Sequence, residues 1–533
     1  MTTPHGTQST PYGRRLMPAV LDAEASLNPT RIFASIPKTA NLNDGFRDVY
    51  FAEVANATNL VAQWFQHFFG SPKRDFETIT YIGVLDLRYA IVQYAAMKCG
   101  YKTFSPSPWN PVATNLSLMD QTESTKLIFS KELCPLIDGT QMKRQGLRLV
   151  PIDSLENLLA ACTEPFPYNK IFEEAVDDPV VVLHSSGSTC MPRPVTMTHG
   201  TFAAVDYDRN IPSIPGRKNR DSTIWTFDSN CSRKIYETSP PFHFSGFYNK
   251  IMVPLFTDAI PVYGPPLKAP STRIIDIMEC QDIGGMLLPP SLIEQLLHEP
   301  NGLEYIQRLG ILCYAGGPLS QAAGDKIVQY TTLCQFYGST EVGQVRQLVP
   351  LPEDWSYMQF HPQAHVRFEP SEDDTFELVL LADESTRPYM SLPHNFLGIK
   401  EWRTKDLFKR HPTKPDLWKF YGKIDDIIVL STGYKFNPVP MELALQGHPM
   451  IAGAVVAGMG RRQTALLVEL KSEHLNNECL EEKIWQSVER ANADAPEHGR
   501  VARNMIIMAK PEKPFVRAGK GPVMRKLTEA AYA

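Results

Sequence analysis

The chain has 533 residues, of which 43% are hydrophobic and 21% are charged, and its formal net charge is −5. This length predicts two or three folding units, and the composition is ordinary for a globular protein. The mildly acidic balance gives no reason to expect nucleic acid or an anionic membrane as a partner.

The chain starts with MTTPHGTQSTPYGRRLMPAV, which is polar and lacks the apolar core of a signal peptide. No apolar run reaches the roughly 18 residues of a membrane span. The nine cysteines are scattered and include no Cys-x-x-Cys pair, which favours reduced thiols over disulfides or zinc. We therefore expect a cytoplasmic protein without a membrane span.

The predicted elements begin with an extended, weakly ordered lead-in over residues 1–45. A helix is predicted over residues 48–65, where apolar residues recur at helical spacing. A strand at 79–83 and a helix at 87–98 follow, because a Gly ends the helical pattern at position 100. Further strands are predicted at 102–104, 126–129 and 148–151. This alternation is typical of a parallel sheet covered by helices.

The middle of the chain continues this pattern with a mostly β-branched run at 180–183, typical of a buried strand. Short apolar runs, each followed by a turn, recur at 285–289, 311–315 and 333–337. Segments 375–381 and 417–431 are typical of antiparallel hairpins. A hinge is predicted at 422–426. Beyond it, strands at 454–459 and 464–470 and a helix at 480–492 predict a small α+β unit.

The first chemical motif is Ser185-Ser186-Gly187-Ser188-Thr189, directly after a predicted buried strand. Small residues let backbone N–H groups converge, and the hydroxyls add donors, so such a loop suits polyphosphate oxygens. A Ser/Gly turn without function has the same composition. The loop lacks the Gly-Lys-Ser/Thr ending of a P-loop, which disfavours a Walker-type nucleotidase.

The second motif is Gln335-Phe-Tyr-Gly-Ser-Thr-Glu341. Tyr337 could stack on a base, while Thr340 and Glu341 could contact a phosphate and its Mg²⁺. A capped strand-to-helix turn is the alternative.

Two further motifs lie in the last third of the chain. Asp406 could accept from both hydroxyls of a ribose, and Lys423 could donate to the same sugar. Asp425 and Asp426 could equally be a solvated loop pair. Lys520 lies between two glycines, and a lysine on such a loop could neutralise charge on a phosphate; alone it would be a surface residue.

These motifs occur in one order along the chain, and the sequence resembles the adenylate-forming superfamily of acyl- and aryl-CoA synthetases, luciferase and peptide-synthetase adenylation domains. Segments 81–90, 425–438 and 519–525 look like the adenylation domains of fungal peptide-synthetase-like carboxylic acid reductases. The resemblance implies an α/β fold with a large N-terminal lobe of two stacked, helix-covered sheets and a small β-barrel-like subdomain. A small, mobile α+β C-terminal lobe would follow. The implied boundaries are 1–45 for the lead-in, 46–422 for the large lobe and 423–533 for the small lobe.

The resemblance also implies roles for single residues. For ATP, the loop Ser185–Thr189 would hold the β- and γ-phosphates, Tyr337 would stack on adenine, and Thr340 would contact the α-phosphate. Glu341 would bind Mg²⁺, and Asp406 with Lys423 would bind the ribose. Asp425 would be the hinge, and Lys520 would bridge the acid and the α-phosphate.

For the acid, segment 241–246 resembles the wall of the family's substrate pocket. His243 would lie next to the carboxylate and Phe247 would line the pocket. Ala315, Gly316 and Gly317 would form its floor, with Phe336 beside them.

The chain also departs from the family's pattern. Cys190 and Arg193 replace a Gly and a Lys of the phosphate loop, and Arg changes the donor geometry. Lys405 replaces the Gly before the ribose-binding Asp, and Lys423 replaces an Arg. His243 stands where amino-acid-activating members have an Asp, which argues against an α-amino acid substrate.

The resemblance implies ATP-dependent activation of a carboxylic acid to acyl-AMP, with release of pyrophosphate. The aromatic wall favours an aryl acid, such as a substituted benzoic acid, over an aliphatic one. The acyl group would pass to the phosphopantetheine thiol of a carrier domain and then be reduced.

The partners of such a chain would be a carrier (thiolation) domain and a reductase domain. No carrier-type Asp-Ser site follows Lys520 and no Gly-x-Gly-x-x-Gly follows a predicted strand, so we expect an excised or free-standing adenylation domain. A stand-alone aryl- or acyl-CoA ligase shares every motif. A catalytically dead binding protein of the same fold would be expected to lose Glu341, Asp406 or Lys520.

Overall fold

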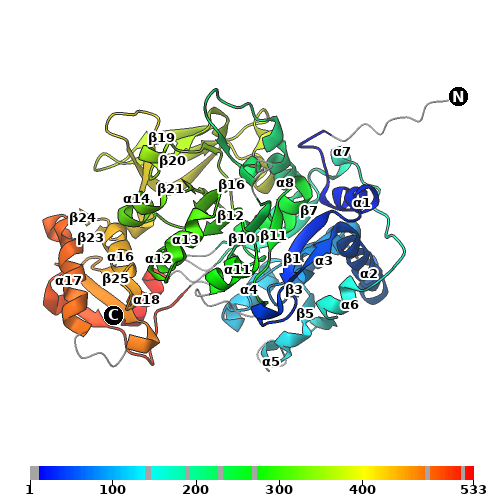
Figure 1. Cartoon of the computed structure of the whole chain (residues 1–533), viewed down its shortest axis with the longest axis horizontal. Coiled ribbons are helices and arrows are strands. Elements are labelled where there is room, and N and C mark those ends of the chain that lie inside the picture. The colour runs from blue at the N-terminus through cyan, green and yellow to red at the C-terminus, as the bar shows by residue number, and fades with distance from the viewer. Residues whose placement is uncertain are drawn as a thin grey trace.

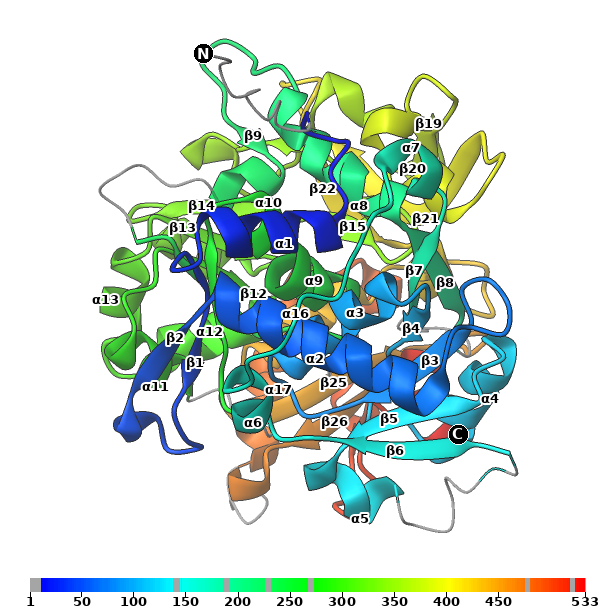
Figure 2. The ribbon, with the colours of Figure 1, turned by 90° about the vertical axis from the view of Figure 1, so that its right-hand side faces the viewer.

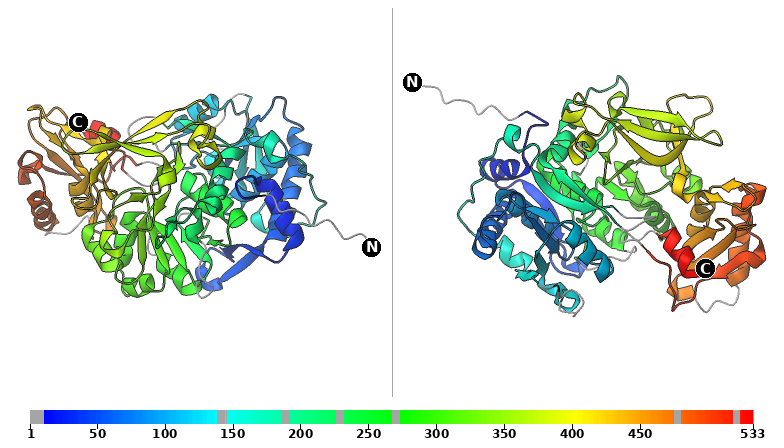
Figure 3. Two further views of the ribbon diagram at one scale, coloured as in Figure 1. Left: turned by 90° about the horizontal axis from the view of Figure 1, so that it is seen from above. Right: turned by 180° about the vertical axis from the view of Figure 1, so that it is seen from behind.

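The structure is a computed structural model, and it describes residues 11–137, 144, 146–185, 192–225, 232–266, 273–474, 480–517 and 523–532. A large lobe holds two extended sheets and an antiparallel subdomain, and a small lobe lies at one end of the molecule (Figures 1 and 3).

The first sheet of the large lobe is parallel except at its last strand, β8. Its strands, in spatial order, are β6 (Arg148–Ile152), β5 (Lys126–Ser130), β3 (Thr78–Ile82), β4 (Lys102–Phe104), β7 (Pro179–His184) and β8 (Pro194–Thr198). β7 is the predicted β-branched run, and its central residues are fully buried. Its carboxyl end therefore delivers Ser185 to the edge of the sheet.

The second sheet is also parallel, apart from the hairpin of β1 and β2. Its order is β14 (Thr332–Gln335), β13 (Ile311–Tyr314), β12 (Gly285–Leu288), β10 (Lys234–Glu237), β11 (Ile260–Val262), β1 (Ile32–Pro37) and β2 (Phe46–Tyr50). Because β12, β13 and β14 are parallel neighbours, the loops that follow them meet at one edge.

Helices pack between and around the sheets. Every residue of α3 (Arg88–Lys98) is buried, and α3 contacts β3, β4 and β7, whereas α2 (Phe51–Phe69) contacts β1 and β2. The two helices pack side by side with α1 (Met17–Leu27), as Figure 2 shows. The other helices of the large lobe are α4 (Val112–Gln121), α5 (Cys134–Ile137), α6 (Leu155–Leu159), α7 (Phe172–Ala175), α8 (His199–Asp206), α9 (Phe244–Phe247), α10 (Val253–Phe256), α11 (Arg273–Cys280), α12 (Pro290–His298), α13 (Gly302–Gln307), α14 (Gln321–Ile327) and α15 (Leu392–Asn395).

The segment predicted as an extended lead-in differs from that expectation in its described part. Residues 17–27 form α1, and residues 32–37 form β1 inside the second sheet. Phe33 and Ala34 are fully buried there, because β1 pairs with β11, which lies more than 200 residues later in the chain. A local sequence pattern does not contain this pairing.

The rest of the large lobe is antiparallel. One sheet has the order β19 (Val366–Pro370), β20 (Phe376–Leu381), β21 (Glu401–Arg410) and β22 (Trp418–Lys423). Another joins β18 (Gln359–Phe360), β17 (Gln347–Leu348) and β9 (Asn219–Arg220), and β15 (Gly338–Ser339) pairs with β16 (Gly343–Gln344).

The small lobe begins after the turn Ile424–Asp426 and has a buried apolar cluster drawn from residues 428–501 alone. Its elements are β23 (Ile428–Val429), β24 (Lys435–Phe436), α16 (Val439–Gln446), β25 (Ile451–Ala457), β26 (Ala465–Leu470), α17 (Leu480–Ala493), β27 (Ile506–Met508) and α18 (Arg525–Tyr532). The predicted fold class, with its large α/β lobe and small α+β lobe, is confirmed. In the described ranges, no helix combines the length and the apolar character that a membrane crossing needs.

Candidate functional site

The ends of β13 and β14 form the base of the candidate site. β13 runs into Ala315, Gly316 and Gly317, and β14 runs into Phe336 and Tyr337. Gly316 has φ +90°, a backbone conformation that residues other than glycine rarely adopt. The glycine floor and the aromatic pair therefore lie at one edge of the second sheet.

Thr340 and Glu341 lie in the turn between β15 and β16. A Cβ at Gly338 would lie 2.3 Å from the carbonyl oxygen of Gly343, so this hairpin requires glycine. Asn395 donates to the backbone carbonyl of Glu341 at 2.8 Å, which fixes the turn. Glu341 is the predicted Mg²⁺ ligand, and one carboxylate with substrate phosphates is a normal Mg²⁺ environment. The described residues contain no group of three or more His, Cys, Asp or Glu that could hold a metal without such phosphates.

Tyr337, Asp406 and Lys423 form a connected group beside this edge. The Tyr337 hydroxyl donates to Asp406 Oδ2 at 2.6 Å, and Lys423 Nζ donates to Oδ1. Asp406 and Lys423 are register partners on β21 and β22. Burial, together with the Asp406 carboxylate, raises the pKa of Tyr337 well above its usual range. Tyr337 therefore remains a hydrogen-bond donor, and the carboxylate keeps lone pairs for further donors.

Lys405, which replaces a glycine of the family's pattern, has φ +60°. This left-handed conformation explains why glycine suits the position, and it costs a lysine about 1–2 kcal/mol. The Lys405 ammonium group lies 3.3 Å from the carboxylate of Asp425, the predicted hinge residue. The substitution therefore places a cation beside the hinge.

A cavity of about 330 Å³ lies between these residues and the small lobe. Its lining from the large lobe includes the predicted residues Gly316, Gly317, Phe336, Tyr337, Asp406 and Lys423. From the small lobe it includes Asp426, Glu442, Val523 and Arg525. Six residues singled out in the sequence thus meet around one space, although they span more than 100 positions of the chain.

Arg525 and Glu442 were not predicted from the sequence. Both guanidinium Nη atoms of Arg525 donate to the Glu442 carboxylate, at 2.5 and 2.6 Å, and Arg525 Nε lies 3.7 Å from Asp426. These partners are 83 residues apart, so no local motif connects them. The only sequence signal for Glu442 was its place as an acidic residue in the first turn of α16. Exposed helices commonly carry such a residue too, so the signal is not specific.

The predicted wall residues lie in the core of the large lobe. His243 is 1% exposed, and its ring centroid lies 6.0 Å from that of His184 at the end of β7. Phe247 is buried and stacks on Phe202 at 5.0 Å. A Cβ built on Gly343 would lie 3.7 Å from Phe244, so α9 reaches the turn that carries Glu341.

The phosphate-loop motif and the Lys520 motif fall mostly outside the described residues. Ser186, Gly187, Ser188, Thr189 and Lys520 lie outside them. At the base of the first loop, Ser185 N donates to the Arg193 carbonyl at 3.0 Å, and Arg193 N donates to Ser185 Oγ at 3.2 Å. On either side of the Lys520 motif, Arg517 and Val523 form an antiparallel bridge, and Val523 lines the 330 Å³ cavity.

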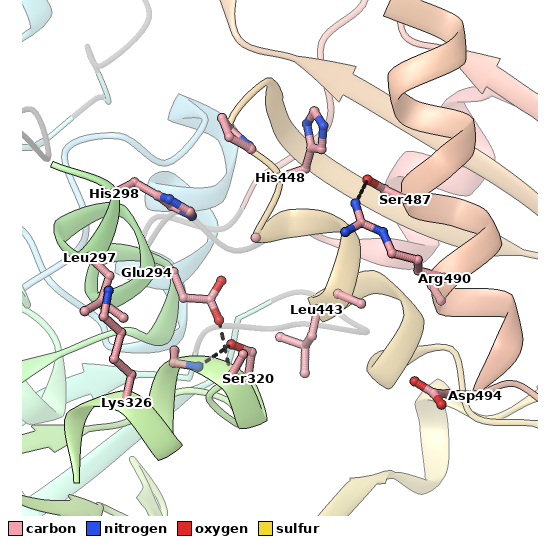
Figure 4. Close-up of a pocket in the computed structure, with 16 residues that line it drawn as sticks. Glu294, Leu297, His298, Ser320, Lys326, Leu443, His448, Ser487, Arg490 and Asp494 are labelled. Carbon is pink, nitrogen blue, oxygen red and sulfur yellow. Dashed lines mark hydrogen bonds between the residues drawn. The ribbon is translucent and has the colours of Figure 1, made fainter. Parts of the chain in front are cut away.

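Another cavity, of about 570 Å³, also lies between the lobes (Figure 4). Glu294, His298 and Lys326 face it from α12 and α14, Arg490 faces it from α17, and Asp494 follows directly after α17. It contains none of the residues predicted to bind ATP or acid, and its lining lacks an aromatic ring that could stack on a base, apart from histidines. The candidate site is therefore the smaller cavity.

Comparisons with known proteins match both lobes to one family of enzymes. A family model described as AMP-binding enzyme matches residues 34–365, and one for the AMP-binding enzyme C-terminal domain matches residues 425–533. A carboxylic acid reductase of Neurospora crassa is 33% identical over 98% of this chain and 50% of its own length. The adenylate-forming reductase Nps11 of Serpula lacrymans is 28% identical over 98% of this chain and 49% of its own length. The chain thus spans about half the length of the curated relatives it matches.

Solved structures show the same fold at low identity. The anthranilate CoA ligase AuaEII, in complex with anthranoyl-AMP, has a TM-score of 0.72 and 14% identity, covering 98% of both chains. A benzoate CoA ligase from Burkholderia xenovorans LB400 has a TM-score of 0.70 and 16% identity, covering 96% of this chain and all of that one. With both lobes matched by their family models, the chain belongs to the AMP-binding family of adenylate-forming enzymes.

Proposed function

We propose that this chain activates a carboxylic acid with ATP, forming acyl-AMP and pyrophosphate. The observation that carries the proposal is the 330 Å³ cavity, where the glycine floor, Tyr337 and the Asp406–Lys423 pair meet the small lobe. A base stacked on Tyr337 would place its ribose hydroxyls at Asp406, because the Tyr337 hydroxyl already contacts that carboxylate.

The chain's own residues would support this reaction by position and charge. The Thr340–Glu341 turn would hold the α-phosphate side of the nucleotide, and the loop Ser185–Thr189 would hold the departing phosphates. Bound Mg²⁺ would neutralise phosphate oxygens, with Glu341 as its protein ligand. Lys520 would contact the oxygens that gain negative charge as the carboxylate attacks phosphorus. The buried wall around His243 would exclude water, which would otherwise hydrolyse the mixed anhydride.

An aryl acid is the proposed substrate class. Phe336 lies beside the glycine floor and stacks nearly parallel on Trp225, with ring centroids 5.9 Å apart. Flat aromatic surfaces favour a flat substrate. The proteins named anthranilate and benzoate CoA ligase, which share the fold, support this choice by analogy.

The acyl group would then pass to a thiol. The curated relatives named reductases are about twice as long as this chain, which supports a carrier domain with phosphopantetheine and a reductase domain as partners. Free coenzyme A is the alternative acceptor. Incubating preformed acyl-AMP and protein with coenzyme A, or with a phosphopantetheinylated carrier domain of a reductase relative, distinguishes them. Thioester formation on the carrier alone is expected; formation on free coenzyme A alone would make the chain a CoA ligase.

Acid-dependent exchange of pyrophosphate into ATP tests the adenylation step. We expect exchange with at least one member of a panel of benzoic, cinnamic, aliphatic and amino acids. Lys520→Ala should abolish exchange while leaving ATP binding largely intact, because Lys520 is assigned to the reacting phosphate. Unchanged exchange in that variant would remove Lys520 from the mechanism, and no exchange with any acid would favour a binding protein with an inactive fold.

A further inference from the structure

Arg220 on β9 is fully buried, at 0% exposure. Its Nη2 donates to the Val345 carbonyl at 3.0 Å and to the side-chain oxygen of Gln347. Its Nε and Nη1 atoms have no hydrogen-bond partner anywhere in the described ranges. Arginine carries five N–H donors, and three of them belong to these two nitrogens. A buried side chain of this kind is therefore left with most of its hydrogen-bonding capacity unused.

The charge of Arg220 also lacks a close ion-pair partner, although the adjacent Asp221 attracts it. Among the described residues, no carboxylate forms an ion pair with it, and Asp221 instead accepts from the backbone N–H and hydroxyl of Thr223. Burial lowers the pKa of Arg220 from its ordinary value. A buried cation without a paired anion costs several kcal/mol, so proteins rarely retain one without a use.

Other buried arginines of the chain show what a purely structural role looks like. Arg346 pairs with Asp208 at 2.5 Å and donates to the carbonyls of Tyr389 and Ala204. Arg88 pairs with both Asp86 and Glu132. Each of these cations forms an ion pair with a carboxylate, whereas no ion pair with Arg220 is found among the described residues.

The surroundings of Arg220 are the elements assigned to the acid pocket. Its guanidinium carbon lies 4.1 Å from the ring centroid of Phe336, which lines the 330 Å³ cavity. Its charge interacts with Cys334 on β14, with Cys313, two residues before the floor residue Ala315, and with Tyr248, directly after the wall residue Phe247. These groups belong to β14, to β13 and to the segment after α9. Arg220 does not itself line the cavity, and the Phe336 ring lies against its guanidinium group and lines the cavity.

We propose that Arg220 binds an oxygen acceptor at the far end of the acid substrate. The protein would then select acids that carry a second carboxylate or a hydroxyl opposite the reacting carboxyl group. This proposal rests on the proposed adenylation of an acid. A substrate oxygen would supply the acceptor that the Nε and Nη1 donors lack, and an anionic one would also compensate the buried charge.

Pyrophosphate exchange with matched acids tests this proposal. Benzoate is compared with 4-hydroxybenzoate and terephthalate, and hexanoate with adipate, through kcat/KM for the acid. Wild type should prefer the acceptor-bearing member of at least one pair by about 10- to 100-fold, the range for a hydrogen bond to a charged group. Arg220→Met should reduce that preference to within about twofold. Arg217→Met, three residues earlier and bonded to Gln359 and Val349 at the surface, is the matched control and should keep it.

Each outcome decides the proposal. Equal use of all matched pairs by wild type, or an unchanged preference in Arg220→Met, would overturn it while leaving adenylation intact. Exchange with no acid at all would overturn both. If Arg220→Met does not fold, Arg220→Lys replaces it, because lysine cannot reach the same donor geometry. The preference should then fall several-fold, and an unchanged ratio would contradict the proposal.

Discussion

Asp406 is the residue on which the proposed ATP-binding site depends most. It is 8% exposed, and its two oxygens already accept from Tyr337 and Lys423. The sequence predicted Asp406 and Lys423 as ribose ligands from their family positions, and the structure places them as register partners. Their role in binding stays a prediction.

Asp406→Asn tests that role through the sugar. The variant removes a charged acceptor, so the KM for ATP should rise by about 10- to 100-fold. Wild type should also prefer ATP over 2′-deoxy- and 3′-deoxy-ATP, and the variant should lose most of this preference. Tyr337→Phe keeps the carboxylate and is the control. A variant that retains the full preference for ATP would exclude Asp406 as the ribose ligand.

Lys405 illustrates a conformational cost at a single residue. Lys405→Ala and Lys405→Gly both remove the exposed ion pair with Asp425, which contributes little. Only the glycine relieves the left-handed conformation at φ +60°. Chemical denaturation should therefore find the glycine variant more stable than the alanine variant by about 1 kcal/mol. Equal stability of the two variants would show that the backbone is unstrained at this position.

At the scale of elements, the sequence predicted strands best where side-chain type and burial agree. The β-branched run of β7 and the apolar runs of β12 and β13 form buried strands, and β14 is a strand that is buried at its two central residues. α1 and β1 were missed because their burial depends on partners distant in the chain. The ion pair between Arg525 and Glu442, and the buried Arg220, were missed for the same reason. Local patterns predict an element, but tertiary contacts decide which polar side chains it brings together.

His199, a buried histidine at the start of α8, should make the protein less stable as pH falls. Its side chain lies beside the Tyr168 hydroxyl, and burial lowers the pKa of His199 to about 3. The unfolded chain takes up this proton below about pH 6.5, whereas the folded protein does not, so folding becomes weaker as pH falls. Between pH 7 and pH 5, His199 should cost the large lobe about 2 kcal/mol of unfolding free energy.

His199→Gln isolates this contribution, because glutamine does not titrate. Urea unfolding at pH 7 and pH 5 should show a smaller loss of unfolding free energy in the variant than in wild type. The difference should be about 2 kcal/mol, because the unfolded wild type takes up one proton that the variant cannot bind. The comparison concerns the change with pH, so a uniform loss of stability in the variant does not affect it. Identical pH dependence in the two proteins would mean that His199 is protonated in the folded state.

At the scale of the whole molecule, two lobes with separate cores share one site. The apolar cluster of residues 428–501 includes no residue of the large lobe, and the cavity between the lobes is lined from both sides. The turn Ile424–Asp426 joins them, and Lys405 and Arg525 contact its two carboxylates. Such an arrangement favours rotation of the small lobe as a rigid body about the turn.

Separate cores predict separate unfolding. Calorimetry should resolve two transitions, and brief proteolysis should cut near residues 422–428 to release a folded fragment of the small lobe. Adding ATP with a substrate acid should slow this cleavage, because the ligands would contact both lobes. A single cooperative transition, with no cleavage near the turn, would contradict the two-lobe description.

The most direct test of acid activation is a single turnover followed by mass spectrometry. The full chain is mixed with ATP, Mg²⁺ and an acid selected by exchange, without any thiol. If the chain activates acids, acyl-AMP should be found bound to the protein in near-equal amount to enzyme, together with pyrophosphate. Formation of ADP and an acyl phosphate, or ATP binding without any product from a broad acid panel, would contradict this activity.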